Sequence, residues 1–166
     1  MMSRKMLAAI ITVCSLAAIP NPIYAEEHEG KNQGIELSPG LLELLREEMR
    51  EIAAGIQTVP LSLVSANWQS IVETSTKIQA SYIMERKLTE AQVNELKQAL
   101  PEHFKQLDAE FHQRAVRLGA AASAHDAELV SFEYSRLIET CATCHAAYAN
   151  LRFPGFSATT EQGHHH

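Results

Sequence analysis

Two cysteines and a histidine lie together near the C-terminal end of the chain, in the segment Cys141-Ala142-Thr143-Cys144-His145. The spacing C-x-x-C-H is typical of c-type haem attachment. Two thiols three residues apart lie on one side of a helical turn, where each can add across one haem vinyl group. The adjacent imidazole then reaches the iron. The motif predicts one covalently bound haem c, held by Cys141 and Cys144, with His145 as the proximal iron ligand.

Three other interpretations of the motif stay open. A thioredoxin-like redox pair needs the C-x-x-C at the start of a helix after a strand, whereas this pair lies near the end of a predicted helix. A zinc site needs further ligands, and the chain has no second C-x-x-C, while His112 and His125 are distant in sequence. The third is a haem-free helical protein in which the two thiols form a simple disulfide or are buried.

Residues 1–25 have the pattern of a secretory signal peptide. A positively charged start precedes an apolar run over 7–19 that is too short to span a bilayer comfortably. Ala25 is the small residue that a signal peptidase requires, so we predict cleavage after it and loss of Cys14 with the leader. A lipoprotein signal acylated at Cys14 and an uncleaved anchor are the alternatives. We expect a periplasmic protein without stable membrane insertion, and haem c is attached outside the cytoplasm.

Length and composition indicate one globular domain. The chain has 166 residues, of which 46% are hydrophobic and 20% charged. Aromatic residues make up only 6% and β-branched runs are short, which disfavours an all-β fold. The net charge is −6, and the chain after residue 25 carries 12 basic against 20 acidic residues, a net charge of −8. No basic block stands out, so we expect no nucleic-acid partner.

Residues 26–38 are a polar lead-in, 39–156 form one helical domain, and 157–166 are a tail that ends in three histidines and that we interpret as a tag remnant. Within the domain, Ser38-Pro39 has the composition of a helix start. Pro60 is expected to kink or end the first helix, or to let it run one turn further. The apolar positions of this helix recur at spacings of three and four, and they are Leu42, Leu45, Met49, Ile52 and Ile56.

Further helices follow with short connections. Asn67 is the predicted N-cap of the second, Thr89 and Gln92 have capping-box spacing for a short helix over 90–99, and Pro101 opens the third long helix. We expect 119–125 to form a turn before the last helix. Such helices must bury their apolar stripes against one another, and the simplest solution is an all-α, antiparallel four-helix bundle. The second stripe is Trp68, Ile71, Val72, Ser75, Ile78 and Tyr82, and the last helix presents Val130, Leu137, Ile138, Cys141, Cys144, His145 and Tyr148.

Over residues 40–150 the chain resembles the class II cytochromes c, the cytochrome c-prime family. The resemblance lies in the C-terminal position of the C-x-x-C-H, in Tyr148 three residues after it, in Pro101, and in Arg46 and Pro60 of the first helix. It implies a left-handed four-helix bundle with covalently attached haem c between the helices, and homodimers through the first two helices in many members.

The chain departs from the family pattern in three places. Many members have a basic residue directly after the tyrosine, where this chain has Ala149, and the nearest arginine is Arg152. The short helix over 90–99 and the tail segment 152–156 lie outside the usual pattern as well. The resemblance therefore assigns no role to these segments.

The sixth coordination position separates two functions. In this family the first helix faces the distal side of the haem, and Met49 lies near the distal position there. Ligation by Met49 would give a six-coordinate haem and a one-electron carrier that exchanges electrons with redox partner proteins. The alternative makes Met49 core packing and leaves a five-coordinate iron that binds nitric oxide or carbon monoxide in a pocket of Leu45, Met49 and Ile52.

No acid–base or nucleophile set accompanies the motif, so we expect no enzyme activity. The acidic run of the first helix is most simply a solvated face, and could instead dock a basic redox partner. His103, His112 and His125 fall at polar or boundary positions and are expected on the surface. The acidic run is Glu43, Glu47, Glu48 and Glu51.

Overall fold

The computed structural model describes residues 35–81 and 87–156, and every regular element in these two ranges is helical. The predicted signal peptide, most of the lead-in, Tyr82, Met84 and the tail 157–166 lie outside them. The elements are α1 (Pro39–Val64), α2 (Trp68–Gln79), α4 (Glu90–Ala99), α5 (Glu102–Ser123), α6 (Ala127–Tyr148) and the 3-10 turn η1 (Pro154–Phe156).

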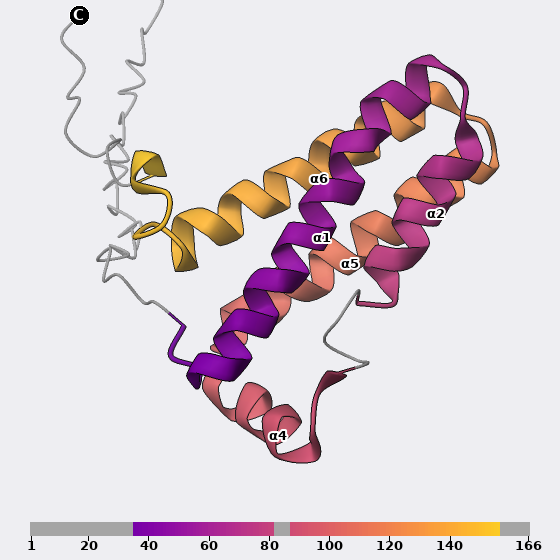
Figure 1. Cartoon of the computed structure of the whole chain (residues 1–166). Helices are drawn as coiled ribbons and strands as arrows, with labels where there is room; N and C mark the ends of the chain where they lie inside the picture. The colour runs from indigo at the N-terminus through magenta and orange to yellow at the C-terminus, as the bar shows by residue number, and fades with distance from the viewer. Residues whose placement is uncertain (1–34, 82–86, 157–166) are drawn as a thin grey trace, which may run out of the picture.

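Helices α1, α2, α5 and α6 form the expected bundle (Figure 1). Neighbours in the chain pack on one another, with α2 against α5 and α5 against α6 as the most extensive interfaces. In contrast, α1 and α6 touch only sparsely. In Figure 1, α6 crosses behind α1, and its C-terminal half diverges from the N-terminal half of α1. The helices of the bundle thus pack most extensively on the side formed by α2, α5 and α6.

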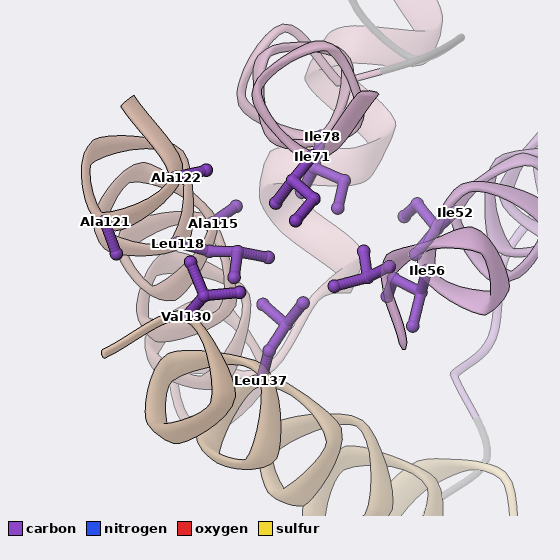
Figure 2. Close-up of a cluster of buried hydrophobic side chains, with 11 residues drawn as sticks. Ile52, Ile56, Ile71, Ile78, Ala115, Leu118, Ala121, Ala122, Val130 and Leu137 are labelled. Atoms are coloured by element: carbon purple, nitrogen blue, oxygen red, sulfur yellow. The ribbon is translucent and has the colours of Figure 1, made fainter. Parts of the chain in front are cut away.

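The apolar core lies where the four helices converge. Figure 2 shows side chains from all four pointing at a common centre, with Ile71, Ile78, Leu118 and Leu137 fully buried among them. Burial of such side chains drives the association of the helices. The remaining members of the cluster are Ile52, Ile56, Val59, Ala115, Ala121, Ala122 and Val130.

The third long helix continues into the segment 119–125, where a turn was expected. Helix α5 ends only at Ser123, and Gly119 lies inside it, fully covered by α2. A β-carbon at residue 119 would lie 3.0 Å from the Cβ of Ser75. The glycine therefore lets two helices approach closely and does not end one, which sequence alone could not distinguish.

Two similar turns join α1 to α2 and α5 to α6. At the first, Asn67 N–H donates to the Ser62 carbonyl and Ala66 N–H to the Leu63 carbonyl, at 2.8 and 3.0 Å, which is the Schellman pattern. Asn67 then caps α2 by accepting from the Ser70 N–H, as predicted. The second turn repeats the pattern at 124–126. Each turn therefore ends one helix and starts the next within a few residues.

Ala66 adopts a positive φ of 54°, the left-handed conformation that glycine tolerates best. We expect Ala66→Gly to raise the free energy of unfolding by about 0.5–1 kcal/mol, because the relief of Cβ strain outweighs the entropy that glycine adds to the unfolded chain. Thermal unfolding followed by circular dichroism measures the shift.

Ala54→Gly is the matched control for this prediction. Ala54 is exposed inside α1, so the same substitution there is expected to destabilise by about 1 kcal/mol. If both variants lowered the unfolding midpoint alike, the turn conformation would not be under strain.

The register of α1 differs from the predicted stripe in its first half. Met49 is 40% exposed. The apolar and acidic side chains that α1 buries are Leu41, Glu48, Ile52, Ile56 and Val59. The helix continues through Pro60 to Val64, as one of the expected alternatives had it. The sequence pattern missed the register because the inward position at residue 48 is occupied by a carboxylate.

Helix α4 is attached to the start of α1 by a side-chain cap. Thr89 and Gln92 form the predicted capping box of α4. The Glu95 carboxylate accepts from the Ser38 N–H at 2.6 Å and from the Ser38 hydroxyl at 3.0 Å. Ser38 is the residue before α1, so a negative charge from α4 lies at the positive end of that helix.

Candidate haem-binding site

Helix α6 carries the whole C-x-x-C-H motif in its last two turns. It starts at an N-cap in which Asp126 accepts from the Leu129 N–H at 2.9 Å. Cys141 packs against the apolar core, and Cys144 lies one turn further along the same side of the helix. Both cysteines and His145 are half-buried. The helix thus presents two sulfurs and an imidazole together beside the core.

Both thiols are free, and their surroundings keep them protonated. Desolvation by burial raises the pKa of the Cys141 thiol to about 11. The pKa of Cys144 is also raised to about 11, mainly by burial and further by the charge of Asp108. Neutral thiols against apolar surface fit a porphyrin vinyl edge, and the donor set of two sulfurs and one imidazole fits haem c. Neither sulfur is committed to a disulfide.

Charged side chains link α1 and α5 electrostatically to the motif. The pKa of Asp108 is raised by desolvation and by the charge of Glu48, and His112 opposes this. Asp108 in turn acts on Cys144. Glu48 of α1 therefore acts on Asp108 of α5, and Asp108 acts on Cys144 of the motif.

Met49 follows Glu48 in the chain but is not part of the core. Its side chain is 40% exposed, whereas Glu48 is 3% exposed and accepts a hydrogen bond from the Ser81 hydroxyl at 3.2 Å. Met49 is therefore not among the buried residues of α1. Ligation by Met49 stays a prediction, as does the distal pocket that includes Leu45 and Ile52.

The acidic run of α1 is not a uniformly solvated face. Glu43 pairs with Arg50 at 2.9 Å and with Arg46 at 3.7 Å, and Glu47 pairs with Lys87 at 3.5 Å. Glu48 is buried. Much of the negative charge that could attract a basic partner is therefore balanced within the chain.

The proximal side of His145 is covered by the segment after α6. Desolvation lowers the pKa of His145, and the charge of Arg152 lowers it further. The Phe153 ring stacks on the imidazole, with ring centroids 4.8 Å apart and 26° between the planes. Sequence reasoning assigned no role to this segment, because nothing in its composition indicates that it folds back onto the motif.

Tyr148 joins the motif end of α6 to the start of α5. Its hydroxyl lies 3.1 Å from His103 Nδ1, and its ring meets Phe104 edge-on with centroids 5.3 Å apart. His103 and His125 are exposed, as expected, and each also contacts an aromatic ring. The ring of His125 stacks on Trp68 with centroids 5.3 Å apart. The half-buried His112 lies 3.7 Å from Asp108.

A comparison with protein families bears directly on this site. The family model described as cytochrome C′ matches residues 36–149, which include α1, α2, α4, α5, α6 and the complete motif. The chain belongs to the cytochrome c′ family. This cytochrome is therefore a haem-binding protein of the c type with a helical bundle fold, as the sequence predicts.

Other comparisons add no relative of this cytochrome. No curated protein and no solved structure matches the chain significantly. Within residues 35–81 and 87–156, no helix is long and apolar enough to cross a membrane. In the same ranges, no group of three or more His, Cys, Asp or Glu side chains is arranged to hold a metal ion by itself.

Proposed function

We propose that this cytochrome is a periplasmic carrier of single electrons that holds one haem c. The observation that carries the proposal is the motif on α6, where two free, protonated thiols and the imidazole of His145 lie together in a chain of the cytochrome c′ family. Cys141 and Cys144 would each hold the haem through one thioether bond, with the sulfur on one vinyl carbon and the former thiol hydrogen on the other. When bound, the haem supplies the change between ferrous and ferric iron.

The chain's own residues hold and shield the group. Cys141 and Cys144 fix it to a rigid helix, and His145 supplies the proximal nitrogen. The signal-peptide pattern of residues 1–25 supports export to the periplasm, where the partners are redox proteins. We propose a carrier and not an enzyme, because the sequence shows no acid–base or nucleophile set beyond the haem motif.

Met49 is our candidate for the sixth ligand of a six-coordinate iron. It is 40% exposed on α1, so its thioether is not enclosed in the core, and methionine together with histidine is a ligand pair of electron-transfer haems. A protein that binds nitric oxide or carbon monoxide at a five-coordinate iron is the alternative.

We expect Met49→Leu to convert a low-spin haem to a high-spin one, because leucine keeps the apolar volume but has no sulfur to donate. Visible spectra of the oxidised protein should lose the weak red band of methionine–iron ligation, and the reduced protein should gain carbon monoxide binding.

Met84→Leu is the matched control, since Met84 is the other methionine after residue 25. It is expected to leave the spectrum unchanged. If the spectrum of Met49→Leu were unaltered, Met49 would not be an iron ligand. A high-spin parent protein that binds carbon monoxide rapidly would establish the gas-binding alternative.

A further inference from the structure

The segment after α6 turns back on itself and returns to the motif. The N–H groups of Arg152 and Phe153 both donate to the Ala149 carbonyl at 2.9 Å, and η1 follows. This turn brings the Phe153 ring onto the His145 imidazole, eight positions earlier in the chain. The Arg152 guanidinium carbon lies 5.8 Å from the centroid of the same phenyl ring. A residue outside the helix thus covers one face of the imidazole.

A ring stacked on the face of an imidazole restricts movement of the imidazole only toward that face. Both ring nitrogens lie in the plane of the imidazole, so a partner on the face leaves them free to bind a metal. The terminal torsion of a histidine is broad, and the ring turns easily unless a neighbour stops it. At 4.8 Å between centroids and 26° between planes, such a turn would drive the edge of the imidazole into the phenyl ring.

We propose that Phe153 is a positioning residue for the axial histidine, fixing the plane of the His145 imidazole and keeping water from the face that it covers. The proposal rests on iron ligation by His145, which is part of the proposed function, but not on the identity of the sixth ligand. Groups that contact a metal-bound histidine orient it and alter its donor strength. Phe153 does so through an aromatic face, and the 149–153 turn holds it in place.

The orientation of an axial imidazole has a spectroscopic signature. The imidazole plane determines how the iron d orbitals that overlap with the haem π system are split, and therefore how far apart the paramagnetically shifted haem-methyl resonances of the ferric protein lie. A residue that only covered the end of the bundle would leave this pattern unchanged. The reduction potential responds as well, because it depends on the axial ligand and on the exposure of the site to water.

The test uses Phe153→Leu and Phe153→Tyr in the complete haem protein. Leucine keeps an apolar side chain but removes the ring, and tyrosine restores the ring. We expect Phe153→Leu to change the spread of the haem-methyl resonances and to shift the reduction potential, while Phe153→Tyr retains the parent pattern. Leu151→Ala, in the same segment and 76% exposed, is the control and should change neither.

The fold is not at risk in these variants, because Phe153 lies beyond the last long helix and is 38% exposed. Haem-methyl shifts in Phe153→Leu that superimpose on those of the parent would overturn the positioning role and leave the proposed function intact. Equal changes in the leucine and tyrosine variants would also contradict it, since the ring would then be irrelevant. A parent protein without such resonances would overturn both proposals together.

Discussion

Replacing Cys141 and Cys144 together by serine is expected to abolish covalent haem attachment completely. The serine hydroxyls keep the size of the thiols and remain one helical turn apart, but they do not form the thioether bonds. Mass spectrometry of the denatured protein should find the added mass of one haem in the parent chain and none in the double variant. Each single variant should retain at most one bond, and should release haem more readily during purification.

The control for this result is Thr143→Ser, which changes an exposed residue between the two cysteines. Serine preserves the hydroxyl that donates to the Glu139 carbonyl at 2.9 Å, so attachment should proceed as in the parent. Haem mass that persisted in the double serine variant would show that the group is held elsewhere. If the parent chain carried no haem mass, the motif would be only a pair of thiols on a helix.

Leu137→Ala is expected to be the most destabilising single change in the bundle core. Leu137 is 0% exposed and belongs to the buried cluster, and Figure 2 shows its side chain pointing from α6 toward the side chains of the other helices. Removing its buried methyl and methylene groups leaves a cavity that closely packed helices fill only in part. We expect the free energy of unfolding to fall by about 3 kcal/mol. Urea denaturation followed by circular dichroism should show a lower midpoint with an unchanged slope.

Leu61→Ala provides the comparison, because Leu61 is 73% exposed on α1. Its removal is expected to change the free energy of unfolding by no more than about 0.5 kcal/mol. If Leu137→Ala cost less than this exposed substitution, the convergence of the four helices would not be the source of stability.

The helices and the haem motif could be predicted from the sequence because their signals are local. Asn67, the Thr89–Gln92 capping box and Pro101 each act within one turn of the chain, and the structure confirms all three starts. The spacing of Cys141, Cys144 and His145 is itself the chemical information. The family match over residues 36–149 supports the same conclusion.

Other features could not be predicted from the sequence because they depend on which helices pack against one another. Gly119 resembles a helix end until α2 is placed against it, where a side chain would collide with Ser75. Glu48 resembles a surface residue because carboxylates rarely face inward, yet the bundle buries it beside Ser81. Periodicity cannot assign the register of a helix when a polar residue occupies an inward position. For this reason the predicted apolar stripe included Met49, whereas the structure buries the neighbouring Glu48.

The sequence alone determined where helices begin, that they must pack as a bundle, and which three residues have the chemistry to hold haem. Tertiary structure decided the register of α1, the depth of Gly119, and the return of Phe153 to His145. The difference is physical. Caps, turns and motif spacing act over a few residues, whereas close approach between helices and the stacking of a distant ring depend on the position of the whole chain in space.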